Sequence, residues 1–196
     1  MAQAENGLGY TATAKALHWI IVALLIVQFV LAWTMPHIRR DTKPDTLINL
    51  HLSFGIVILA IAALRLEWRL THAEPPPEDG LPPWQVQTAR ILHWLLYLLL
   101  FAVPVLGWMN ASFRGFPVIL FGLIELPKLM ATRAPGFAWT GDVHGLLATY
   151  ALLALVALHV AAAFYHWLVR HDRVLQRMLP GGVPTRKADI CDRNIQ

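Results

Sequence analysis

Four long runs of the sequence contain no Asp, Glu, Lys or Arg, and the charged residues lie in the polar segments between and after them. The runs are 19 to 27 residues long, whereas a helix that crosses the hydrocarbon core of a bilayer needs about 20 apolar residues. We therefore expect an all-α integral membrane protein, a bundle of four membrane-spanning helices. The charge-free runs are residues 16–38, 46–64, 91–113 and 143–169, and the predicted helices cover about residues 14–35, 47–69, 86–109 and 142–170.

The segments between the predicted helices indicate no second domain. Residues 74–83 contain five prolines and three acidic residues, which is typical of an extended linker. Residues 116–124, within the long connection 110–142, are apolar but too few to span a bilayer, and we expect an amphipathic segment at the membrane surface. Residues 1–180 are predicted to form one four-helix domain, and residues 181–196 a cytoplasmic polar tail.

The composition favours a membrane protein and excludes several other classes. Hydrophobic residues make up 57% of the chain and charged residues 14%, whereas charged residues account for about 25% of a typical soluble domain. The net charge of +4 does not indicate a nucleic-acid partner, because the basic residues lie between apolar runs, as in membrane proteins. Cys191 is the only cysteine, so disulfides, a thiolate cluster and the CxxCH attachment of c-type haem are excluded.

The positive charges predict the orientation of the helices. With the N-terminus in the cytoplasm, the inner segments hold ten of the sixteen Lys and Arg residues and the outer loops hold six. Cytoplasmic loops are enriched in positive residues, so we expect both termini in the cytoplasm. The six outer charges either steer a small anion toward the protein or anchor lipid headgroups, and the sequence leaves both functions open. These residues are Arg39, Arg40, Lys43, Arg114, Lys128 and Arg133.

Five histidines fall within the predicted spans, where ionisable side chains are costly and usually face the bundle interior with a partner. Antiparallel threading places His51 and His144 near the outer surface, and His18, His93 and His159 nearer the inner one. His144 and His159 are fifteen residues apart, which corresponds to about 22 Å along a helix and a rotation of about 60°. Both can therefore face one interior at two depths, too far apart to bind a single metal ion. Each histidine taken alone could equally be a hydrogen-bonding group between helices.

Two imidazoles that face each other across an apolar bundle suit the axial ligation of haem, whose porphyrin supplies the other four donors. A transition-metal ion bound by protein alone would need three or four ligands at one depth, often with carboxylates, and the charge-free runs contain no carboxylate. Gly55, Gly107 and Gly145 are candidates for close approach of the backbone to a flat ring, although glycine in a span also serves helix packing.

The ordered set of histidine motifs resembles the bacterial dihaem cytochrome b561 family. The resemblance covers most of the chain between His18 and Pro180, and it depends on the combination of motifs rather than on any single one. The matching segments are Ala16-Leu17-His18-Trp19, Asn49-Leu50-His51-Leu52-Ser53-Phe54-Gly55, Leu92-His93-Trp94-Leu95-Leu96-Tyr97, Pro104-Val105-Leu106-Gly107, His144-Gly145-Leu146-Leu147-Ala148, Ala157-Leu158-His159-Val160-Ala161-Ala162-Ala163, Tyr165-His166 and Val174-Leu175-Gln176-Arg177-Met178-Leu179-Pro180.

The resemblance implies two haems b stacked across the bilayer, with His18 and His159 as ligands of the inner haem and His51 and His144 as ligands of the outer one. We expect fourteen residues between the two histidines of the fourth helix, so the fifteen found here predict a local widening of that helix. His93 also matches a family histidine, and we expect it to contact a haem propionate, a quinone or a neighbouring helix.

A haem with two histidine ligands has no open coordination site, which indicates electron transfer rather than oxygen activation. The family is similar to the superoxide oxidases, which implies an oxidoreductase or electron carrier of the bacterial inner membrane. Its donor would be periplasmic, with superoxide as one candidate, and its acceptor would be ubiquinone, a bound substrate. His166 lies seven residues after His159, close to the same helix face, and it is our first candidate for a quinone contact.

Two alternatives stay open at this point. In the first, the chain is the haem-binding membrane anchor of a larger redox complex, such as a hydrogenase or dehydrogenase, with a redox protein as its partner. In the second, it is a haem-free membrane scaffold or transporter whose histidines join the helices by hydrogen bonds. The expected partners are membrane lipid, quinone and a redox protein, and no nucleic acid.

Overall fold

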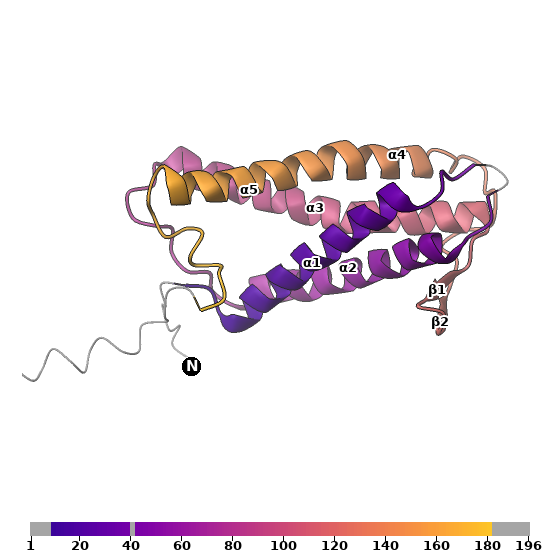
Figure 1. Ribbon diagram of the computed structural model, residues 1–196, viewed down its shortest axis with the longest axis horizontal. Helices are drawn as coiled ribbons and strands as arrows, with labels where there is room; N and C mark the ends of the chain where they lie inside the picture. The colour runs from indigo at the N-terminus through magenta and orange to yellow at the C-terminus, as the bar shows by residue number, and fades with distance from the viewer. Residues whose placement is uncertain (1–8, 40–41, 182–196) are drawn as a thin grey trace, which may run out of the picture.

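A computed structural model describes residues 9–39 and 42–181 of the chain. In this part of the chain, four long helical segments lie side by side along the molecule, with a small hairpin at one end (Figure 1). All four are long and apolar enough to cross a membrane, which confirms the predicted four-helix membrane bundle. The elements are α1 (Ala12–Thr34), α2 (Thr46–Thr71), α3 (Pro83–Arg114), β1 (Val118–Leu120), β2 (Ile124–Leu126), α4 (Thr140–Leu146), the π-helix η1 (Leu147–Leu152) and α5 (Leu153–Leu168).

Two parts of the sequence-based predictions fall outside the described residues. Apart from Gly181, the predicted polar tail lies there, and Cys191 lies within it. Arg40, one of the six outer basic residues, also lies outside the described ranges.

The helix ends follow the local sequence. The Thr11 hydroxyl accepts an N–H from the first turn of α1 at 3.3 Å, and the Asp45 carboxylate accepts the Ile48 N–H at 2.8 Å. Such side chains satisfy N–H groups that have no partner within the helix. Helix α3 begins at Pro83, where the missing N–H carries no penalty, so it starts inside the stretch predicted as linker. It ends at Gly115, which has a left-handed φ of 80°.

The helices pack in sequence order. Helix α2 packs along α1 and α3, and α3 packs along the continuous α4–η1–α5 helix. Over the described residues, the backbones of α1 and the α4–η1–α5 helix make no close contact. Side chains bridge part of the space between these two helices, because Leu25 and Phe29 of α1 pack against the cluster that contains buried Leu152. The rest of this space is not filled by the backbone of either helix.

Large apolar side chains cover the outside of the bundle. Leu98 is 61% exposed and Tyr150 is 69% exposed, although both lie in the middle of long apolar helices. Monomeric soluble proteins rarely expose large apolar patches, whereas lipid favours them. The surface therefore fits the lipid-facing side of a membrane protein.

A β-hairpin closes one end of the bundle (Figure 1). We expected an amphipathic segment here, and the structure forms two short antiparallel strands because the chain reverses at Phe121 and Gly122, whose φ values are 49° and 76°. Buried Ser53 of α2 joins the hairpin to the bundle. Its hydroxyl donates to the Ile119 carbonyl at 3.2 Å and accepts the Phe121 N–H at 2.9 Å.

The opposite end is closed by the α2–α3 linker and the segment that follows α5. Arg177 is only 8% exposed, because its guanidinium pairs with the Glu78 carboxylate and donates to the Pro76 carbonyl. The Trp19 indole N–H of α1 donates to the Met178 carbonyl at 2.9 Å. Both connections hold the post-α5 segment across the bundle end.

Candidate functional site

His51 of α2 and His144 of α4 face each other near the hairpin end. Their ring centroids are 6.1 Å apart and the ring planes are nearly perpendicular, at 87°. An imidazole nitrogen lies about 2.0 Å from a bound metal ion, so two rings on opposite faces of a haem iron have centroids roughly 6 Å apart. We call His51 and His144 the outer pair. The distance between their rings fits a haem iron between them.

Hydrogen bonds orient both rings of the outer pair. His144 Nδ1 lies 2.8 Å from the Val103 carbonyl, and because a carbonyl only accepts, Nδ1 carries the proton and Nε2 is left to bind a metal. His51 Nε2 lies 3.3 Å from the Gln28 amide nitrogen, which also donates to the His51 carbonyl at 3.1 Å. His51 Nδ1 and Gln28 Oε1 are buried without a hydrogen-bond partner among the described residues. The outer pair and its neighbour Gln28 thus include buried polar atoms that have no hydrogen-bond partner among the described residues.

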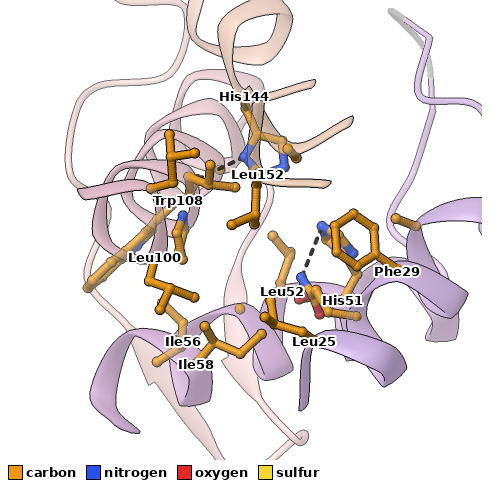
Figure 2. A pocket seen from close by; sticks show the side chains of 18 of the residues that line it. Leu25, Phe29, His51, Leu52, Ile56, Ile58, Leu100, Trp108, His144 and Leu152 are labelled. Atoms are coloured by element: carbon orange, nitrogen blue, oxygen red, sulfur yellow. Dashed lines mark hydrogen bonds between the residues drawn. The ribbon is translucent and has the colours of Figure 1, made fainter. Parts of the chain in front are cut away.

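An apolar cleft surrounds the outer pair, and His51 and His144 enter it from different helices (Figure 2). It encloses about 680 Å³ of empty space, part of it open to the outside. Residues of α1, α2, α3 and the α4–η1–α5 helix all line the cleft. Its larger apolar lining residues include Leu25, Phe29, Leu52, Ile56, Leu100 and Trp108.

Of the three glycines considered from the sequence, Gly107 has a clear steric role. A Cβ at Gly107 would lie 2.9 Å from His144 Cε1 and 3.1 Å from His144 Nδ1, closer than real Cβ contacts allow. A Cβ at Gly55 would meet only the Gln28 amide at 3.5 Å, and a Cβ at Gly145 would meet nothing within 4 Å. Gly107 therefore makes room for the His144 ring itself.

Three histidines gather toward the other end of the bundle. The rings of His18 (α1) and His159 (α5) have centroids 6.2 Å apart at 73°, a spacing that matches the outer pair. His93 of α3 is nearer to His159, with centroids 5.4 Å apart at 68°. His159 therefore lies between two imidazoles, and only its separation from His18 reproduces the outer spacing.

The π-helix η1 lies between His144 and His159 and explains how both reach the interior. A π-helix places more residues in each turn than an α-helix, so it absorbs one extra residue without advancing the following side chains by a full step. The local widening predicted from the fifteen-residue spacing is confirmed at Leu147–Leu152.

His166 lies in the last turn of α5 and contacts a carboxylate from the segment beyond it. Its Nδ1 is 2.6 Å from Asp172 Oδ2, and Arg170 Nε lies 3.3 Å from the same oxygen. Burial alone would raise the pKa of Asp172, but hydrogen bonds from His166 and the Val174 N–H, together with the charge of His166, hold it below its usual value. Asp172 is therefore an ionised partner that orients His166.

The basic residues of the hairpin end do not form one uninterrupted patch. Arg114 is half-buried, donates to the Arg39 carbonyl at 3.1 Å and has a buried Nε without a partner. Among the described residues, three acidic side chains, Asp45, Glu125 and Asp142, belong to the same end of the bundle. In the part of the chain that the structure describes, four basic side chains at this end are exposed to solvent: Arg39, Lys43, Lys128 and Arg133.

Several residues of the site were absent from the sequence-based prediction. Gln28 carried a usable signal, since it is the only Asn or Gln in the charge-free run 16–38. Asp172 is a carboxylate just beyond the fourth span, but its pairing with His166 depends on a chain turn after α5. The Val103 carbonyl that orients His144 has no signal, because every residue carries a carbonyl.

The chain resembles known proteins over most of its length. A family model described as "Prokaryotic cytochrome b561" matches residues 9–181. The chain is 31% identical over 175 residues to "Probable superoxide oxidase CybB" of Yersinia pestis, covering 87% of this chain and 96% of the relative. It is 29% identical to "Cytochrome b561 homolog 2" of Escherichia coli (strain K12), covering 87% and 90%. It is 29% identical to "Cytochrome b562" of Cereibacter sphaeroides, covering 87% and 95%.

Replacing Gly107 by alanine should disturb the outer pair specifically. The added methyl group would push His144 away from the Val103 carbonyl, and we expect a destabilisation of about 1–3 kcal/mol with loss of haem absorbance from the outer pair. Thermal unfolding and the visible spectrum of the purified protein measure both effects. Gly145→Ala is the matched control, because it adds the same methyl group where nothing lies within 4 Å. Equal behaviour of the two variants would contradict the steric role of Gly107.

Proposed function

Because the chain belongs to the prokaryotic cytochrome b561 family, it is a bacterial membrane-bound b-type cytochrome that binds haem b, and we propose that it carries two haems and transfers electrons from an outer donor to ubiquinone. The observation that supports this proposal best is that two pairs of histidine rings have nearly the same distance between their centroids, 6.1 Å for one pair and 6.2 Å for the other. The two pairs are about 22 Å apart along the fourth helix. That spacing supports one haem in each half of the membrane.

In this proposal His51 and His144 hold the outer haem, and His18 and His159 hold the inner one. Each bound haem supplies an iron that gains and loses one electron. Two imidazole nitrogens would be available to each iron, so the chemistry supplied would be electron transfer rather than oxygen activation. The Val103 carbonyl fixes the tautomer of His144, and the apolar cleft keeps water away from the site. His93 is a neighbour of the inner haem rather than a ligand.

The donor side is proposed at the hairpin end, with both termini in the cytoplasm. One relative carries the printed name "Probable superoxide oxidase CybB", and superoxide is a small anion that positive surface charge attracts. Arg39, Lys43, Lys128 and Arg133 are exposed at this end. Among the described residues, these four exposed positive charges outnumber the three acidic ones at this end, which supports an anionic donor.

The acceptor side is proposed beside His166 at the opposite end. Two superoxide ions each give up one electron and leave as O₂, and ubiquinone takes up the two electrons and two protons to become ubiquinol. His166 is placed to donate a proton to a quinone oxygen and to regain it from the cytoplasm. Asp172 Oδ2 lies 2.6 Å from His166 Nδ1, and this contact fixes the orientation of the imidazole.

Haem stoichiometry tests the two-haem proposal directly. We expect two haems per chain in the pyridine haemochrome assay, and one in His144→Ala or His159→Ala. The double variant His51→Ala/His144→Ala should still retain one haem, because both residues serve the same iron, whereas His144→Ala/His159→Ala should retain none. A wild-type value of one haem, or equal losses in the two double variants, would refute the pairing.

Superoxide-driven haem reduction tests the donor side. Changing Arg39, Lys43, Lys128 and Arg133 together to glutamine should slow reduction roughly tenfold at low ionic strength, and the difference should shrink as salt is added. Stopped-flow absorbance at several salt concentrations measures this dependence. A control variant, Arg90→Gln/Arg173→Gln, removes exposed charges from the other end and should reduce at the wild-type rate. A salt-independent, unchanged rate in the fourfold variant would remove the steering role.

Quinone-driven reoxidation tests the acceptor side. His166→Ala should slow electron transfer from the reduced protein to a ubiquinone analogue roughly 100-fold, because positioned proton donors contribute about 10²–10⁴ in rate, while reduction by superoxide stays unchanged. His171→Asn, a nearby histidine replaced by a residue that tolerates its positive φ of 54°, is the control. Wild-type reoxidation in His166→Ala would place the quinone elsewhere.

A further inference from the structure

We propose that Arg65 is the counter-charge of a propionate carboxylate on the haem held at the inner histidines. The inference rests on the proposed function, since it requires a haem between His18 and His159. It assigns a ligand contact to a residue of α2 that none of the histidine motifs includes.

Arg65 lies at the depth that such a contact needs. Its Nη1 donates to the Ala14 carbonyl of α1 at 2.7 Å, and Ala14 precedes His18 by four residues, or about 6 Å along the helix. Arg65 therefore lies about one helical turn from the inner rings, on the side of the nearer membrane surface. Its charge is close enough to interact with His18, His93 and His159.

The charge of Arg65 has no carboxylate partner among the described residues. The ion pairs in this part of the chain involve Arg69, Arg170, Arg177 and His166, and none includes Arg65. Arg65 is half-buried, and charges removed from water are normally paired. One guanidinium nitrogen is used by the Ala14 carbonyl, which leaves other N–H groups of the five for an anion.

Haem supplies the missing anion. Its two propionates lie on one edge of an otherwise apolar ring, and an Arg guanidinium binds a carboxylate through two parallel hydrogen bonds. Arg69, one turn further along α2, is already committed to Glu74 at 2.8 Å and to the faces of Trp94 and Tyr97 at 5.3 Å and 5.5 Å. Arg65 therefore lies close to the inner histidines and has no carboxylate partner among the described residues.

The reduction potential of the inner haem tests the assignment. Arg65→Gln keeps an N–H donor for the Ala14 carbonyl but removes the charge, whereas Arg65→Lys keeps the charge. An optical redox titration should resolve two components, and the component missing from His18→Ala identifies the inner haem. In Arg65→Gln we expect its reduction equilibrium to shift about tenfold toward the oxidised form, about 59 mV for one electron, with the outer component unchanged.

The controls separate the possible outcomes. Arg65→Lys should keep the wild-type potential, and Arg173→Gln, an exposed position beyond the end of α5, should change neither component. An unchanged inner potential in Arg65→Gln with two haems present would overturn the assignment, and so would equal shifts in the glutamine and lysine variants. A wild-type protein with one haem, or a His18→Ala variant with two, would instead refute the proposed function.

A second measurement applies if Arg65→Gln does not fold. Wild-type apoprotein is reconstituted with haem dimethyl ester, in which both propionates are esterified. The positive charge of Arg65 then has no propionate partner. The reduction potential of the inner haem should therefore rise, and the reduction potential of the outer haem should change less. Equal responses of the two components would overturn the assignment.

Discussion

The structure depends on imidazole side chains that meet in pairs inside an apolar helical bundle. Each ring brings polar nitrogens into a region with little water, and such groups are stable only when something binds both nitrogens. For His144 the protein satisfies one nitrogen through the Val103 carbonyl and leaves the other free. His144 Nε2 is thus available as a metal ligand, and haem b is the group that the family binds.

Two local features of the backbone make the pairs coincide. The π-helix at Leu147–Leu152 accommodates one more residue than the regular helix would between His144 and His159. Gly107 removes the side chain that would occupy the position of the His144 ring. Both features weaken ordinary helix packing, since a π-turn and a mid-helix glycine are each less favourable than α-helix with alanine. Their presence beside the histidines fits a fold arranged around the ligand positions.

The sequence was sufficient for the helices and the levels of the histidines, because charge-free runs and helical periodicity are local properties. It was less accurate where tertiary contacts decide the outcome. Helix α3 extends to Arg114 because Gly115, rather than the end of the apolar run, terminates it. The hairpin depends on Ser53, which lies 66 residues before its partner Ile119. The contact of Arg65 with Ala14 joins two helices, so no pattern along either helix could reveal it.

The two ends of the bundle differ in a way that gives the proposed electron transfer a direction. The hairpin end has basic side chains in excess but offers no buried acid beside a histidine among the described residues. The opposite end holds His166 against Asp172, within a segment that Arg177 fixes to the linker. Reduction of a quinone consumes protons, whereas oxidation of superoxide releases none. A proton donor is therefore needed at one end only, and the His166–Asp172 pair occurs at the end that we propose faces the cytoplasm.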